Sequence, residues 1–324
     1  MAEPFRKARP LLIAVAVGAA VAIGVLVIRE AARVPSGDAD PRYRYSLEKL
    51  VAIPSELPRY NRSADILLPL DSPRGVAAGA DGRLVVCGDR FLLVLDPRGT
   101  VLERYDLEEA PVCVSAGPDG RVYVGFQDHV EVIDTRDGSQ RYWPDLGDQA
   151  VVTSIAVHEA GIYVADAGNR MVLRFDRDGR LQGSINDDFL VPSPYFDLAA
   201  AADGSLWVVN PGRHRLQHYD REGNLIGSWG RNSLDIDGFG GCCNPTHIAL
   251  LPDGSFATSE KGIPRVKVYS PDGQLTAVVA VPKDFGEYEA GLDLAVTAEG
   301  TIVLLVPGER TLRLYRPKAA AGGS

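Results

Sequence analysis

A hairpin turn ending in glycine recurs six times along the 324-residue chain and sets the first limit on its fold. The turn glycines lie at intervals of 38, 41, 43, 50 and 46 residues, and each stands between two runs of apolar residues. They are Gly82, Gly120, Gly161, Gly204, Gly254 and Gly300. Self-similarity at such a spacing is the signature of a repeat protein. The chain is therefore predicted to consist of six copies of one unit.

Each unit is predicted to form four β-strands. The third unit, residues 154–185, reads SIAVHEAG, IYVADAG, NRMVLRFDRDG and RLQGSI, with a turn between successive runs. Asp-Gly between alternating apolar residues is a strong hairpin signal, because both central turn residues need a positive φ. The sequence thus predicts an all-β protein built from antiparallel four-stranded sheets.

The first strand of every unit alternates between aliphatic and small residues. The aliphatic positions are Val76, Val114, Ile155, Leu198, Ile248 and Leu294. The small positions that follow them are Ala77, Ser115, Ala156, Ala199, Ala249 and Ala295. Alternate residues of a strand point to opposite faces, and small residues suit an innermost strand where neighbouring sheets converge. A radial array of sheets, the six-bladed β-propeller, has this geometry.

The composition of the last unit predicts where the propeller begins and ends in the sequence. The sixth unit contains three strands, and we expect its fourth to be Ala64–Leu70, so that an N-terminal strand closes the ring and removes the last free sheet edge. The propeller is then predicted to span residues 63–318, preceded by a linker at 29–62 and followed by a disordered tail at 319–324.

The N-terminal segment is predicted to anchor the protein in a membrane. Residues 11–28 are eighteen apolar or small residues without a charge, and residues 1–10 contain three basic residues. About 20 helical residues span a bilayer. The basic tail favours a cytoplasmic N-terminus, which would place the propeller on the periplasmic or extracytoplasmic side. The alternative is a signal peptide that is cleaved, leaving a secreted protein.

The net charge argues against nucleic acid as a partner. Residues 1–35 hold five basic and two acidic residues, so of the total charge of −9 about −12 falls on the remainder of the chain. An acidic domain repels phosphate backbones. We therefore expect a protein partner rather than nucleic acid, in addition to the membrane.

Two units resemble a known repeat family. The segments IYVADAGNRMVLRFDRDG and LWVVNPGRHRLQHYDREG are similar to NHL repeats, in which an apolar strand is followed by Asp or Asn, Gly, a basic residue, another apolar strand and a closing Asp-Gly. The resemblance covers about residues 64–317. It implies a six-bladed propeller that is often a protein-binding platform and sometimes an enzyme.

Polar residues at one repeated position suggest a site at the mouth of the central channel. Seven residues before the turn glycines stand Cys113, Asp197, His247 and Asp293, whose donors suit a divalent metal ion. The same position bears zinc-binding histidines in the NHL-like lyase that cleaves peptidyl hydroxyglycine, and calcium-dependent lactonases are similar propellers lined by Glu, Asn and Asp. This chain has one such histidine and two such aspartates. Alternatively, the aspartates cap backbone amides and His247 is structural.

All four cysteines, Cys87, Cys113, Cys242 and Cys243, are expected on the same face. In an oxidising compartment they favour disulfides, including a redox-sensitive bond between the adjacent Cys242 and Cys243. Buried free thiols and metal thiolates are the alternatives.

A basic residue is also expected on this face of each blade, near the start of the third strand. These residues are Arg90, His129, Arg170, Arg213, Arg265 and Arg310, with Lys261 beside them. Such a ring of cations suits an anionic ligand or an acidic partner surface. The alternative is a role in packing the repeats.

The sequence favours a binding module over an enzyme. No local catalytic motif such as GxSxG or HExxH occurs. The leading prediction is a membrane-anchored extracytoplasmic NHL-type propeller that binds a partner through the face at the channel mouth. The alternatives are a metal-dependent hydrolase or lyase at that mouth, lactonase-like or hydroxyglycine-lyase-like, and a redox protein that uses the adjacent cysteines.

Overall fold

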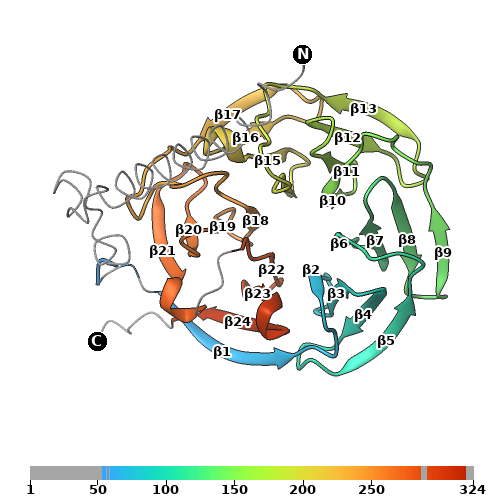
Figure 1. Cartoon of the computed structure of the whole chain (residues 1–324), viewed down its shortest axis with the longest axis horizontal. Coiled ribbons are helices and arrows are strands. Elements are labelled where there is room, and N and C mark those ends of the chain that lie inside the picture. Colours follow the sequence, from blue (N-terminus) through green and yellow to red (C-terminus); the bar gives the residue numbers. More distant parts are fainter. Residues whose placement is uncertain (1–52, 56, 58, 286–289, 319–324) are drawn as a thin grey trace, which may run out of the picture. The chain divides into compact units, whose positions relative to one another are not determined.

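Six antiparallel four-stranded sheets surround a central channel (Figure 1). The computed structural model describes residues 53–55, 57, 59–285 and 290–318. Within them the predicted six-bladed β-propeller is confirmed. The predicted membrane span at 11–28 and the tail at 319–324 lie outside the described residues, as does most of the predicted linker. Among the residues that the structure describes, no helix has the length and apolar character needed to cross a membrane.

Blades 1 to 3 each consist of four consecutive strands. Blade 1 contains β2 (Pro73–Ala78), β3 (Leu84–Gly88), β4 (Phe91–Leu95) and β5 (Val101–Asp106). Blade 2 contains β6 (Cys113–Ala116), β7 (Arg121–Gly125), β8 (Val130–Asp134) and β9 (Ser139–Tyr142). Blade 3 contains β10 (Val152–His158), β11 (Gly161–Asp166), β12 (Met171–Phe175) and β13 (Leu181–Ile185).

Blades 4 and 5 repeat this order, and blade 6 differs. Blade 4 contains β14 (Leu198–Ala200), β15 (Leu206–Asn210), β16 (Arg215–Tyr219) and β17 (Leu225–Trp229). Blade 5 contains β18 (His247–Leu250), β19 (Phe256–Ser259), β20 (Val266–Tyr269) and β21 (Leu275–Ala280). Blade 6 contains β22 (Leu294–Val296), β23 (Ile302–Val306), β24 (Thr311–Pro317) and β1 (Tyr60–Leu67). In the part of the chain that the structure describes, short 3-10 helices lie at Pro211–Arg213, Pro282–Asp284 and Pro307–Glu309.

The N-terminal strand closes the ring, as the sequence predicts. β1 pairs antiparallel with β24 at the outer edge of blade 6. The strand begins at Tyr60 rather than Ala64, because its pairing continues across a bulge between Arg62 and Ala64 as far as Pro317. It ends at Leu67, before Pro69, which has no N–H to donate to a ladder. The strand therefore takes in three residues of the predicted linker.

The conformation of the Asp-Gly turns is explained by the two residues that give them their name. At the turn between β18 and β19, Gly254 has φ +82°, a conformation that other residues seldom adopt. The carboxylate of Asp253 beside it accepts the amide of Ser255 at 2.9 Å. Asp203 and Ser205 repeat this contact in blade 4, also at 2.9 Å. Asp-Gly thus supplies both the left-handed residue and the acceptor that such a turn requires.

One hydrophobic cluster lies between each pair of neighbouring blades. The aliphatic residue of each first strand packs toward the preceding blade, as Val76 does beside Val303 and Leu305 of blade 6. The small residue after it packs toward the next blade, as Ala77 does beside Val114 of blade 2. Because every first strand contacts the first strands of both neighbours, the six clusters form a closed circle around the channel.

Candidate functional site

The mouth of the channel opens on one face of the propeller, which we call the mouth face. In an antiparallel four-stranded blade, the start of the first strand, the loop between the second and third strands, and the end of the fourth strand share one edge. The mouth face thus comprises those loops, such as 260–265, and the connections between blades, such as 230–246. The opposite face, which we call the turn face, carries the Asp-Gly turns.

The channel is lined by polar as well as apolar side chains, among them Arg74, Ser115 and Thr153. Its cavity has a volume of about 270 Å³ and is lined along its length by small and aliphatic residues of the six first strands. At the predicted register position, five polar residues also line it: Cys113, Ser154, Asp197, His247 and Asp293. The sixth register position is Gly75. These side chains, which share one position of the repeat, therefore line one channel.

Two aspartates at the mouth connect neighbouring blades. Asp197 accepts the amide of Leu198 at 2.9 Å and, with its other oxygen, the amide of Ile248 in the next blade at 2.7 Å. Asp293 does the same with Leu294 and with Val76 of blade 1, both at 2.8 Å. Each carboxylate therefore has the backbone-capping role that the sequence offered as an alternative to metal binding.

His247 lies between these two carboxylates. Its Nδ1 is 3.6 Å from Asp197 Oδ2 and 3.5 Å from Asp293 Oδ1. The ring meets Tyr195 edge-on, with ring centroids 5.8 Å apart. The side chain of His247 is 17% exposed, and that of Asp293 21%. Since Nδ1 faces the carboxylates, Nε2 is the ring nitrogen left for a ligand in the channel.

Burial and mutual charge shift both groups toward neutral pH. Burial raises the pKa of Asp293 to about 6, against the opposing effect of the nearby His247. Burial alone would lower the pKa of His247, but its hydrogen bond with Asp197 and the charges of Asp293 and Asp197 together raise it. An acid with a pKa of about 6 beside an imidazole with a raised pKa is an arrangement that acid–base chemistry uses, and structural pairs also show such shifts.

Stability is expected to fall as the pH rises through this range. The folded-state pKa of Asp293, about 6, lies above its ordinary value of 3.8, so the fold favours the protonated acid. Its contribution to the free energy of unfolding is therefore full below about pH 4 and lost by about pH 6, a change on the order of 1–3 kcal/mol. Denaturant unfolding between pH 4 and 7 should show this slope, and Asp293→Asn should remove it. An unchanged slope in the variant would contradict the assignment.

His247 contributes with the same sign. Because its pKa is raised in the folded state, its contribution is full below pH 6.5 and is lost as the pH rises through the folded-state pKa.

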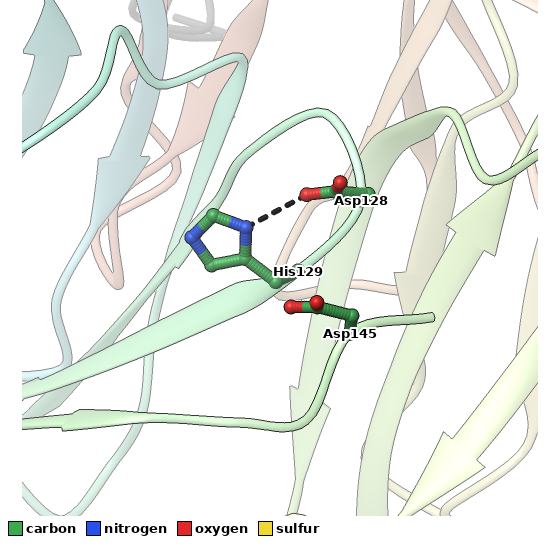
Figure 2. A group of neighbouring side chains, drawn as sticks. All are labelled: Asp128, His129 and Asp145. Atoms are coloured by element: carbon green, nitrogen blue, oxygen red, sulfur yellow. Dashed lines mark hydrogen bonds and ion pairs between the residues drawn. The ribbon is translucent and has the colours of Figure 1, made fainter. Parts of the chain in front are cut away.

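A second group of potential metal ligands lies in blade 2. Figure 2 shows Asp128 and His129 in the loop between β7 and β8, and Asp145 in the connection after β9. His129 Nδ1 is 2.8 Å from Asp128 Oδ1, and one ligand atom from each of the three residues lies within 4.8 Å of the others. His129 also stacks on Phe126, with ring centroids 4.6 Å apart.

Oxygen and imidazole donors of this kind suit zinc or manganese. The ligand atoms of the predicted set, Asp197, His247, Asp293 and Cys113, do not lie within 4.8 Å of one another. Both carboxylates of the set already accept backbone amides. A metal at the channel mouth stays a prediction.

The four cysteines are free thiols in the structure. Cys87 and Cys113 are buried, and burial raises the pKa of both thiols, which makes them unreactive. Cys242 is exposed, and its Sγ is 2.9 Å from Sγ of Cys243. No disulfide joins any of the four, so the predicted disulfides are not present in this structure. A bond between Cys242 and Cys243 stays a prediction.

Mild oxidation of the folded protein is expected to join Cys242 to Cys243. The two sulfurs already touch and Cys242 is accessible to an oxidant. Alkylation followed by mass spectrometry should then find both residues unmodified and their peptide lighter by two hydrogens. In Cys243→Ser, Cys242 should be alkylated under the same conditions. Alkylation of both cysteines in the oxidised native protein would contradict the prediction.

The predicted basic residues do not form one ring. Arg90, Arg170, Arg213 and Arg310 are exposed, and Arg213 and Arg310 form ion pairs with Asp188 and Asp71. His129 is half-buried beside Asp128. Arg265 is buried, with 2% of its side chain exposed, and pairs with Glu260. The reason is the long connection before β18, whose residues help to cover the loop that contains Arg265.

Sequence reasoning missed two side chains that shape this face. Tyr195 packs against His247, and Lys261 Nζ lies 4.6 Å from the centre of the Tyr195 ring and 3.2 Å from Ser193 Oγ. Lys267 in β20 is fully buried and donates to the carbonyls of Ile236 and Gly238. Neither belongs to the repeat register, so only the conformation of the blade connections places them here.

The fold and the channel mouth together define the class of protein, a six-bladed β-propeller. No protein-family model matches the chain, and no characterised protein matches it in sequence. Among solved structures, the chain is similar to a structure of streptogramin B lyase, with a TM-score of 0.57 and 10% identity over 80% of this chain and 98% of that one. It is also similar to a chain in a crystal structure of a mitotic checkpoint complex, with a TM-score of 0.62 and 12% identity over 89% and 99% of the two chains. These likenesses support the fold alone.

Proposed function

We propose that the protein is a binding module of the NHL-repeat type that receives a protein partner on its mouth face. The observation that carries this proposal is the difference between the two faces. The turn face has short hairpin turns, whereas the mouth face has the long connections 186–197 and 230–246, which precede Leu198 and His247. Loops held on a rigid scaffold are where binding residues concentrate.

We further propose that residues 11–28 hold the propeller at the extracytoplasmic side of a membrane, as their composition predicts. External protease added to spheroplasts should then degrade the propeller. Protection until the membrane is lysed would contradict this placement and leave the binding proposal untouched.

Site-directed photocrosslinking in cells tests the binding proposal. A photoreactive residue at Arg213 or Arg170, both exposed on the mouth face, is expected to give adducts of discrete mass. The matched control is the same residue at Arg98 or Asp272, both exposed in turns of the turn face. Equal adducts from both faces, or adducts from the turn face alone, would contradict the proposal.

An acid–base enzyme is the second candidate, and His247 favours it. An imidazole held between Asp197 and Asp293, with both His247 and Asp293 shifted toward neutral pH, is suited to proton transfer. The lactonase-like and lyase-like alternatives predicted from the sequence make lactones the substrates to assay. Turnover of lactones with added calcium or zinc that disappears in His247→Ala would support it. Equal turnover by the variant would remove His247 from the reaction.

A further inference from the structure

Asp128, His129 and Asp145 bring one imidazole and two carboxylates together at an edge of blade 2, and none of them lines the central channel. Figure 2 shows that two different loops supply them. One donor atom from each residue lies within 4.8 Å of the other two, and His129 Nδ1 is 2.8 Å from Asp128 Oδ1. Donors about 2.0–2.2 Å from a tetrahedral zinc ion lie about 3.3–3.6 Å from one another. The three side chains are thus spaced to hold one ion.

Hydrogen bonds of the backbone hold the two loops together before any ion binds. The amide of Leu146, next to Asp145, donates to the carbonyl of Asp128 at 2.7 Å. The amide of Phe126 donates to the carbonyl of His129 at 2.9 Å and closes a tight turn around Asp128. The imidazole stacks on the buried Phe126 ring, with the two planes 5° apart. Ligands fixed in this way lose little entropy when they bind an ion.

The carboxylates of Asp128 and Asp145 are free to bind an ion, unlike those at the channel mouth. Among the described residues, the carboxylate of Asp128 forms a hydrogen bond or ion pair only with His129, and that of Asp145 forms none. Asp197 and Asp293, by contrast, each accept two backbone amides. The side chain of Asp128 is 45% exposed and Asp145 is exposed, so an ion can reach both from solvent.

A comparison with blade 6 shows what this edge of blade 2 lacks. His129 and Arg310 each stand immediately before the third strand of their blade, and Asp145 and Asp71 each follow the fourth strand. In blade 6 the guanidinium of Arg310 is 2.9 Å from the carboxylate of Asp71. In blade 2 an imidazole, which has no fixed positive charge, faces the carboxylates of both Asp128 and Asp145. Among the described residues, no lysine or arginine pairs with either carboxylate.

Glu131 adds a third acidic group near His129. It lies two residues further along the chain, in β8, and is fully buried. Neither of its carboxylate oxygens has a hydrogen-bond partner among the described residues, and its charge interacts with that of His129. A buried acid without a partner is uncommon, because its lost hydration costs about 1–3 kcal/mol or more. A positive charge held at His129 would offset part of that cost.

We propose that Asp128, His129 and Asp145 bind one zinc ion, through His129 Nδ1 and one oxygen of each carboxylate. An imidazole with two carboxylates suits zinc better than calcium or magnesium, which prefer oxygen ligands. The two carboxylates neutralise the double charge of the ion, and three protein ligands leave a coordination position open to solvent. The site is part of the mouth face, yet zinc binding requires no partner. Its absence would therefore leave the photocrosslinking test of the proposed function standing.

Calorimetric titration of the full chain in detergent with zinc chloride, after treatment with a chelator, tests the proposal. One zinc ion per chain is expected to bind with a Kd on the order of 10 μM, because three ligands bind more weakly than the four of a structural site. Magnesium chloride at the same concentration is not expected to compete. Absence of saturable zinc binding, or equal binding of magnesium, would overturn the proposal.

His129→Arg removes the nitrogen ligand by a change that the repeat already contains. Arg310 shows that an arginine at this position of a blade pairs with the connection after the fourth strand. The variant is therefore expected to fold and to bind zinc at least about 100-fold more weakly. Thermal unfolding without zinc checks that it is folded. Native zinc affinity in a folded His129→Arg would contradict the assignment.

Asp145→Asn keeps the proposal testable if His129→Arg fails to fold. The carboxylate of Asp145 has no partner among the described residues, so its loss should not disturb the fold and should weaken zinc binding about tenfold or more. Asp148→Asn alters another exposed acid of the same connection and should leave binding unchanged. His247→Ala should also bind zinc like the native protein. Loss of binding in His247→Ala but not in Asp145→Asn would assign the ion to the channel mouth and overturn the proposal.

X-ray absorption at the zinc edge identifies the donor atoms. Nitrogen and oxygen donors at about 2.0–2.2 Å are expected, without a sulfur shell at about 2.3 Å. A sulfur shell would place the ion on cysteine, such as the exposed Cys242, and would overturn the proposal.

Discussion

Replacing Glu260 with alanine is expected to lower the free energy of unfolding by about 3–5 kcal/mol, because it leaves buried cations without their anion. Glu260 is 1% exposed and contacts both Arg265 and Lys267 at 2.6 Å. The variant retains the positive charges of Arg265 and Lys267, whose side chains are at most 2% exposed. Deprotonation of Lys267, whose pKa is already lowered to about 8, would offset part of this loss at alkaline pH. Denaturant unfolding at pH 7 and pH 9 measures both effects.

Lys267→Met is the matched control for Glu260→Ala. It removes one cation, so Glu260 and Arg265 remain as a neutral pair. It also frees the carbonyls of Ile236 and Gly238, and we expect a smaller loss of about 1–3 kcal/mol. An equal or larger loss in Lys267→Met would show that the loop contacts, and not the charge balance, stabilise this part of blade 5.

Asp197→Ala is expected to cost about 1–3 kcal/mol, because it removes an acceptor of two amides and leaves that of Ile248 unpaired, whereas the amide of Leu198 keeps Ser154 Oγ at 3.3 Å. The amides belong to Leu198 of blade 4 and Ile248 of blade 5. The loss of stability is therefore expected to arise at the contact between blades 4 and 5. Thermal unfolding followed by circular dichroism measures it.

Two variants bracket the effect of Asp197→Ala. Asp197→Asn keeps one acceptor oxygen and should lose less than the alanine variant. Glu222→Ala removes an exposed acidic residue from a turn of blade 4 and should change stability by no more than about 0.5 kcal/mol. If Asp197→Ala were as stable as Glu222→Ala, the cross-blade hydrogen bonds would contribute nothing measurable.

The fold was predictable because one pattern of strands and turns recurs in six units of the sequence. Asp-Gly turns with a carboxylate acceptor recur in four of the six units, and the alternation in each first strand assigns one residue to each neighbouring blade. The bounds of β1 were not predictable, since they depend on how far β24 extends beside it and on a bulge at Arg62. Pairing partners distant in sequence set such limits.

The candidate site was predictable in place but not in chemistry. The register put Asp197, His247 and Asp293 on one channel and offered amide capping as one role of the aspartates, but it could not reveal that each carboxylate also accepts an amide of the following blade. Arg265 was predicted as a member of an exposed ring of cations and is instead buried. Lys267 occupies a third-strand position that is also buried in other blades, as Leu93 and Arg313 are, and carbonyls of the long connection before β18 accept its donors. These outcomes depend on loop conformations, which follow no repeat.

The pairing of β1 with β24 fixes when the molecule can finish folding. Blades 1 to 5 are each continuous in sequence, so each can form as soon as it leaves the ribosome or an export channel. Blade 6 needs residues 60–67 and 311–317, and these are separated by the whole of the other blades. The ring therefore stays an open arc until β24 has been delivered. Loss of β1 would expose the edge of β24, and loss of β24 would expose the edge of β23, so both segments are necessary for a closed propeller.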